Sequence, residues 1–79
     1  MYLKRLKDLR EDHDLSQEVI SKLLKITRPQ YSLYETGKRD IPVDLLSILA
    51  KYYNTSIDYI VGDTDISKRY PENANKKKQ

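Results

Sequence analysis

Arg28 and Gln30 carry side chains suited to reading DNA bases, and they flank Pro29 at an expected helix start. An arginine guanidinium can donate two hydrogen bonds to guanine, and a glutamine amide can pair at two points with adenine. Ser32 and Leu33 follow on the same segment, where Leu33 is either a contact to a thymine methyl group or a scattered surface leucine. We expect these four residues to contact bases; the alternative is a solvated, polar helix start.

Residues around this segment offer contacts to the phosphate backbone. Thr27 begins the segment and is expected first to cap the helix, and Lys38 and Arg39 follow in a loop. Such contacts give affinity and salt dependence without reading sequence, although a basic loop can also be simply solvated. Tyr31 and Tyr34 lie three residues apart on one helix face and are expected mainly in the core. Their hydroxyls are further candidates for phosphate contacts.

Short helices are expected to position these side chains. Apolar residues recur at helical spacing, and capping or breaking residues mark the helix ends, with starts at Ser16, Thr27, Pro42 and Ser56 and stops at Gly37 and Gly62. The second helix is expected over about 16–24 and the recognition helix over about 27–36. Because so few residues separate them, these two helices must cross steeply, as in a helix-turn-helix. The N-terminal half of the recognition helix then enters the major groove.

Four segments resemble, in order and spacing, the Cro/C1-type helix-turn-helix family of phage and bacterial repressors: 9–17, 27–39, 42–54 and 56–62. The resemblance covers residues 3–62. It implies an all-α fold, a compact five-helix bundle of the lambda-repressor-like DNA-binding type, within a domain spanning residues 1–62. It also implies transcriptional repression by a dimer bound to operator DNA.

The same resemblance assigns roles to particular residues. Gln17, at the start of the second helix, is implied to anchor the DNA backbone, where free N–H groups also favour a phosphate. Arg10 and Glu35 match positions that often form an internal ion pair, and Tyr34 takes the place of a usual tryptophan. Lys25 stands where the family often has glycine, which predicts a left-handed backbone at a cost of about 1 kcal/mol.

Composition excludes several kinds of chemistry. The chain has no cysteine and a single histidine, His13, which is expected in a solvated turn. Disulfides, thiolate metal sites and thiol catalysis are therefore excluded. Since no nucleophile stands beside a base and no glycine-rich phosphate loop is present, we expect neither an enzyme nor a bound cofactor or metal. Because no apolar run approaches a membrane span or a signal peptide, the cytoplasm is the expected location.

The net charge of +3 belongs to the C-terminal end, because basic residues outnumber acidic ones by five to one in residues 68–79. Residues 63–79 are polar and are expected to form a disordered tail. Such a tail is more typical of a solvated chain end than of a specific binding element, although a basic tail can also contact DNA phosphates.

Sequence-specific binding of double-stranded DNA by a dimeric repressor is the function that these features favour. Ile57, Ile60 and Val61 put apolar surface on a short terminal helix, where they either form a homodimer interface or only close the monomer core. The alternative is an antitoxin, or another protein-interaction module of the same fold, that binds a protein partner as well as operator DNA.

Overall fold

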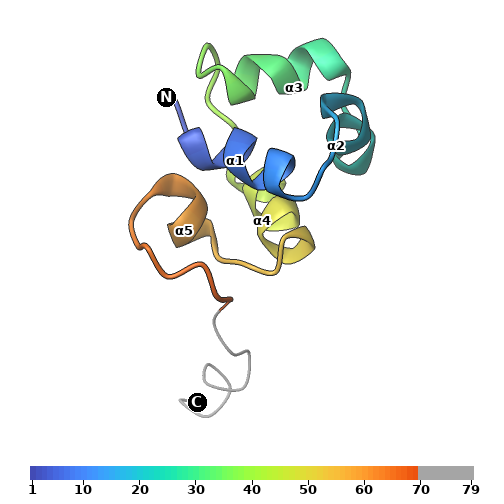
Figure 1. The fold of residues 1–79 in the computed structure, drawn as a ribbon. Helices are drawn as coiled ribbons and strands as arrows, with labels where there is room; N and C mark the ends of the chain where they lie inside the picture. Colours follow the sequence, from blue (N-terminus) through green and yellow to red (C-terminus); the bar gives the residue numbers. More distant parts are fainter. Residues whose placement is uncertain (70–79) are drawn as a thin grey trace.

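Five α-helices and no strands make up residues 1–69, the part of the chain that this computed structural model describes (Figure 1). The helices are α1 (Lys4–Asp12), α2 (Gln17–Leu24), α3 (Arg28–Glu35), α4 (Val43–Tyr52) and α5 (Ile57–Val61). The all-α, five-helix expectation is confirmed. The expected bounds of the second and third helices differ from those of α2 and α3 only at the flanking residues, which are capping positions.

Hydroxyl side chains fix the starts of α2, α3 and α5. The side chains of Ser16, Thr27 and Ser56 each accept a hydrogen bond from the backbone N–H three residues further on, at 3.0–3.2 Å. A cap of this kind satisfies one of the free N–H groups of the first turn and contributes about 1 kcal/mol. The expected capping role of Thr27 is therefore confirmed, and it fixes where the recognition helix begins.

Every helix contributes to one core. Leu6, Ile20, Tyr31, Leu49 and Ile60, one from each helix in chain order, are all at most 1% exposed. Ile60 was a candidate for the dimer interface, and its burial assigns it to the monomer core instead. This correction has a simple cause, because a short terminal helix can close a thin core only by burying its apolar side chains.

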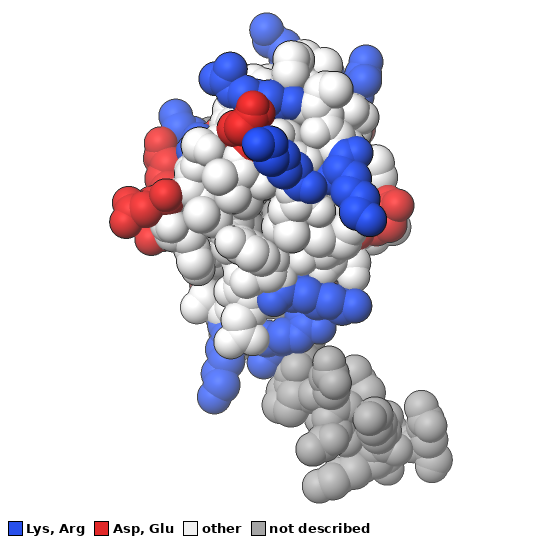
Figure 2. Space-filling view, turned by 90° about the vertical axis from the view of Figure 1, so that its right-hand side faces the viewer, with Lys and Arg blue, Asp and Glu red and all other residues white. Residues whose placement is uncertain are grey.

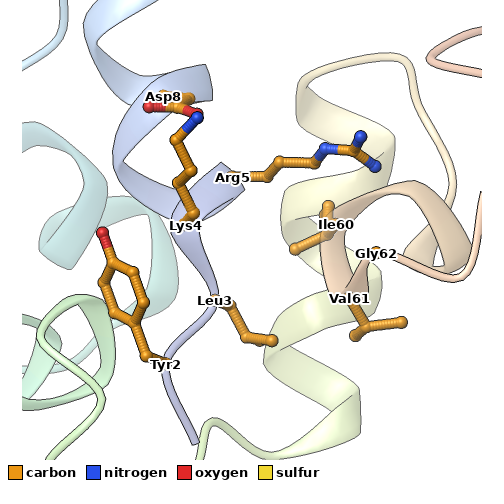
Figure 3. Close-up of a pocket in the computed structure, with 8 residues that line it drawn as sticks. All are labelled: Tyr2, Leu3, Lys4, Arg5, Asp8, Ile60, Val61 and Gly62. Carbon is orange, nitrogen blue, oxygen red and sulfur yellow. The ribbon is translucent and has the colours of Figure 1, made fainter. Parts of the chain in front are cut away.

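Residues 63–69, which were expected to belong to the polar tail, lie against the helices. Arg5 of α1 donates hydrogen bonds to the backbone oxygens of Tyr59 at 2.7 Å and Thr64 at 2.6 Å, and its side chain extends from α1 towards α5 in Figure 3. Arg69 donates to the backbone oxygen of Thr55 at 3.1 Å. The two arginines thus tie this segment to α1 and to the start of α5. Residues 70–79 of the expected tail lie outside the described residues.

No helix within residues 1–69 combines the length and apolar character needed to cross a membrane. Figure 1 shows α3 along one edge of the molecule, with α2 beside its start and α4 and α5 on the far side of α1. The fold therefore presents α3 at the surface and keeps the other elements behind it.

Candidate nucleic-acid interface

The turn between α2 and α3 comprises residues 25–27 and contains a left-handed residue. Lys25 has φ 59° and ψ 40°, as the substitution of lysine for the usual glycine predicted. Its backbone N–H donates to the Lys22 oxygen at 3.1 Å, and that of Ile26 donates to the Ser21 oxygen at 3.0 Å, so the end of α2 is closed internally. Because the chain reverses so tightly, α3 crosses α2 and does not run alongside it (Figure 1).

The outward side of α3 carries the residues expected to read bases. Arg28 is exposed and makes no hydrogen bond or ion pair within residues 1–69, whereas Gln30, Ser32 and Leu33 are half-buried. The Gln30 amide nitrogen donates to the Tyr34 hydroxyl at 3.3 Å, so its side chain is held along the helix. Of the four, Arg28 is thus the only one that is exposed, and all its donors are available to a ligand.

Tyr31 and Tyr34 lie on the opposite, inward side of α3. Tyr31 is fully buried, and its hydroxyl has no accessible surface. The expected phosphate contact of Tyr31 is therefore wrong for this conformation, because the amphipathic spacing that identifies the helix turns this residue into the core. Tyr34 is 4% exposed and also packs in the interior, with its hydroxyl engaged by Gln30.

Thr36 is a residue of this surface that the sequence reasoning missed. It caps the C-terminal end of α3, is exposed, and follows Leu33 by three residues, which places both on one side of the helix. Its hydroxyl donates to the Ser32 backbone oxygen at 2.9 Å. Extending the helical spacing from Leu33 by one turn would have found it.

Beneath the surface, α3 is tied to α1 by the ion pair that the resemblance implied. Arg10 donates to Glu35 through Nε at 2.9 Å and through a terminal nitrogen at 2.8 Å, and its other terminal nitrogen donates to the Leu15 oxygen at 2.8 Å. Gln17 donates to the same carboxylate at 3.2 Å. One buried carboxylate therefore joins α1, the start of α2 and the end of α3.

The electrostatics of this cluster keep Glu35 charged. Burial alone would raise the pKa of the Glu35 carboxyl, but hydrogen bonds from Arg10 and Gln17 outweigh it and hold the pKa below its usual value. The hydrogen bond to Glu35 in turn raises the pKa of Arg10. Burial, and then the nearby Glu35 carboxylate, raise the pKa of Tyr31. The Arg10–Glu35 pair is therefore ionised at neutral pH, and it holds α1 and α3 together.

A basic loop follows α3. Lys38 and Arg39 are exposed, and the Arg39 N–H donates to the Leu33 backbone oxygen at 3.1 Å, so the loop stays close to the helix. Gly37 begins it at φ +81°, and a Cβ there would lie 2.8 Å from the Tyr2 Cα. Only glycine fits both the conformation and the contact. Figure 2 views the molecule from the α2 side, and there basic side chains gather in the upper part, at the level of α2 and α3, above a broad uncharged area.

Two crossing helices joined by a tight turn, set in a five-helix unit, define the class: this is a helix-turn-helix domain. Residues 6–60 match the family model described as helix-turn-helix, and the chain belongs to that family. The resemblance to the Cro/C1-type helix-turn-helix family is thereby confirmed.

Relatives and a solved structure are similar over most of this chain. It is 42% identical over 65 residues to YobD of Bacillus subtilis (strain 168), named as an HTH-type transcriptional regulator, covering 82% of this chain and 58% of YobD. It is 35% identical over 60 residues to antitoxin PezA of Streptococcus pneumoniae, covering 76% of this chain and 38% of PezA.

A crystal structure of a transcriptional regulator from Listeria innocua superposes with a TM-score of 0.74 at 25% identity, covering 98% of this chain and 70% of that one. The chain thus spans little more than half of YobD and less of PezA. The functions of those longer proteins are therefore only proposals for this chain.

Proposed function

We propose that this chain is a transcriptional regulator that binds double-stranded DNA sequence-specifically, with the first turns of α3 in the major groove. The observation that carries the proposal is the guanidinium of Arg28 at the outer start of α3, which is exposed and pairs with no residue of the described part, 1–69. A guanidinium held at that point of a helix-turn-helix can donate its paired hydrogen bonds to a guanine edge. Family membership supports the same function.

The other contacts follow from the position of each residue. Gln30, Ser32 and Leu33 complete the base-reading side; the Gln30 amide donates one N–H to Tyr34 and keeps its second N–H and its oxygen for adenine. The phosphate contacts are assigned to Gln17, Thr27, Lys38 and Arg39, which stand at the two helix starts and in the basic loop. These contacts would fix the register of α3 on the duplex.

We further propose that the protein acts as a dimeric repressor in the cytoplasm, without catalysis and without a cofactor. A dimer reads two half-sites that lie about 34 Å apart, so its operator has two-fold symmetry. Repression needs only occupancy of such an operator. Of the α5 residues first considered for the dimer contact, Ile57 and Val61 remain half-buried at the surface and stay candidates.

The test is selection of bound duplexes from a randomised DNA pool at about physiological salt, because salt sets the non-specific background. An enriched sequence with two-fold symmetry supports a specific, dimeric binder. Repeating the selection with Arg28→Ala should remove preference at one base-pair position. Lys4→Ala is the matched control, because it also removes a cation, but from a surface pair with Asp8 on α1. An unenriched pool with the native chain would contradict sequence-specific binding.

Similarity to PezA favours one second candidate, an antitoxin that binds a protein partner as well as DNA. Co-purification from the native host, with and without nuclease treatment, separates the two functions. A stoichiometric protein partner that survives nuclease treatment, together with DNA binding, would support the antitoxin. Recovery of the chain alone would favour a regulator that acts without a protein partner.

A further inference from the structure

Lys25, in the turn between α2 and α3, has a backbone conformation that lysine rarely adopts. Three non-glycine residues within residues 1–69 have a positive φ: Asp14 at 54°, Lys25 at 59° and Asn54 at 55°. Aspartate and asparagine enter the left-handed region more readily, because their short polar side chains can bond to the local backbone. Lys25 is therefore the residue of the three whose conformation is not explained by its own type.

Contacts within the described part of the chain do not account for a lysine at this position. The end of α2 is closed by the backbone N–H groups of Lys25 and Ile26, and glycine would supply the first of these without steric cost. The Lys25 side chain is exposed, and its ammonium makes no hydrogen bond or ion pair with residues 1–69. Backbone strain is typical of functional sites, so this strain points to a partner outside the chain.

Lys25 also belongs to a row of exposed cations that leads to the base-reading end of α3. Lys22, Lys25 and Arg28 follow one another at intervals of three residues, and none of their side chains pairs with a described residue. Glu18, one turn before Lys22 on α2, forms no ion pair with it. Basic side chains gather at this level of the molecule in Figure 2. Positive charge thus extends from the last turn of α2 to the first residue of α3.

We infer that Lys25 is a further DNA contact, whose ammonium binds a backbone phosphate just outside the base pair read by Arg28. With the first turns of α3 in the major groove, the turn that precedes α3 lies at the edge of the groove, where the phosphates are. A lysine ammonium binds a phosphate as a point charge and reads no base. This inference rests on the DNA binding proposed above, and it extends the bound DNA beyond the bases that α3 reads.

Replacing Lys25 separates a DNA contact from a structural role. Lys25→Gly removes the charge and relieves the backbone strain, so the midpoint of thermal unfolding should stay the same or rise by up to about 8 °C. Affinity for the selected operator should nevertheless fall by about threefold to tenfold, and the slope of log affinity against log salt should fall by about 1. Lys25→Arg keeps the cation and should keep both the affinity and the slope.

Lys51→Ala is the matched control. Lys51 is also an exposed cation that pairs with no described residue, but it lies on α4, which Figure 1 shows on the far side of α1 from α3. The control removes the same charge and should change neither the affinity nor the slope. An effect of net charge alone would change both variants alike, so the difference between them measures the contact.

The length of the duplex locates the contact. The first duplex ends at the base pair whose preference is lost with Arg28→Ala, and there the native chain and Lys25→Gly should bind equally, because the flanking phosphate is absent. The second duplex is longer at each end by half a helical turn, about five base pairs, and there the native chain should bind more tightly. Fluorescence anisotropy with labelled duplexes gives both comparisons.

Two results would overturn the inference while leaving the proposed function in place. One is that the native chain and Lys25→Gly bind the longer operator with the same affinity and the same salt slope. The other is that Lys25→Gly loses as much affinity on the shorter duplex as on the longer one, together with a lower unfolding midpoint, which would give Lys25 a structural role. A native chain that binds no duplex would contradict the proposed function and this inference together.

Discussion

Replacing Glu35 with glutamine tests the buried cluster that joins α1, α2 and α3. Glu35 is 4% exposed, and the Arg10 side chain that it binds is 12% exposed. Glu35→Gln keeps the shape but leaves the Arg10 guanidinium as a buried charge without a counter-ion. Breaking a buried pair in this way costs about 3–5 kcal/mol.

The expected loss is smaller here, about 2–3 kcal/mol of the free energy of unfolding at pH 7. Arg10 keeps its 2.8 Å hydrogen bond to the Leu15 oxygen, and the new amide oxygen still accepts one hydrogen bond. A domain of this size has about 4–12 kcal/mol in total, so the change is large enough to measure. Urea unfolding followed by circular dichroism gives the value, with Asp8→Asn, a surface pair at 3.7 Å, as the control expected to lose under about 0.5 kcal/mol.

The pH dependence gives a second readout. Because folding lowers the pKa of Glu35, its ionisation stabilises the fold above the pKa of the unfolded chain, and this contribution is lost as pH falls through the folded pKa. The difference between the native chain and Glu35→Gln should therefore be constant near neutral pH and shrink in acid. A loss below about 0.5 kcal/mol, or a difference that does not change in acid, would refute the reasoning.

The remaining predictions concern the surface of α3 and its loop. Arg28→Ala should weaken binding to the selected operator by about 1–3 kcal/mol while leaving binding to random duplex unchanged, as measured by fluorescence anisotropy; equal losses on both would make Arg28 a phosphate contact. Lys38→Ala and Arg39→Ala should each reduce the slope of log affinity against log salt by about 1, and an unchanged slope would remove that residue from the interface. Gly37→Ala should lower the free energy of unfolding by about 1–3 kcal/mol in thermal denaturation, and a neutral result would mean that the chain around Tyr2 shifts freely.

The sequence was enough to predict the elements, because their determinants are local. Three hydroxyl residues mark helix starts, because each side chain accepts a hydrogen bond from the backbone N–H three residues further on: Ser16, Thr27 and Ser56. The left-handed backbone of Lys25 and the Arg10–Glu35 pair both follow from the family resemblance. Each of these depends on a residue type at a fixed spacing.

The segment after α5 could not be predicted in this way. Arg5 holds it through the backbone oxygen of Thr64 at 2.6 Å and the carboxylate of Asp65 at 2.7 Å. A backbone acceptor leaves no mark on residue type, and an exposed aspartate such as Asp65 suits a solvated tail equally well. The polar composition of this segment predicted a tail, because composition reflects only how much apolar surface a segment can bury. It does not reveal the contact that the Arg5 side chain of α1 makes with the segment. The core position of Tyr31 was predicted, but whether its hydroxyl reaches the surface could not be, since a tyrosine suits both a core and a polar surface.

The placement of the DNA surface depends on the interior more than the exposed residues suggest. Gln17 is assigned to the phosphate backbone, yet its amide nitrogen is held by Glu35, at the opposite end of α3 from Arg28. Movement of the Glu35 carboxylate would shift the start of α2 relative to α3. It would thereby displace the contact that Gln17 makes with the phosphate backbone. Glu35→Gln should therefore weaken DNA binding under conditions where the variant remains folded, although Glu35 itself contacts no DNA. The effect should fall on operator and random duplex alike, because it acts through the register of the backbone contacts and leaves Arg28 unchanged.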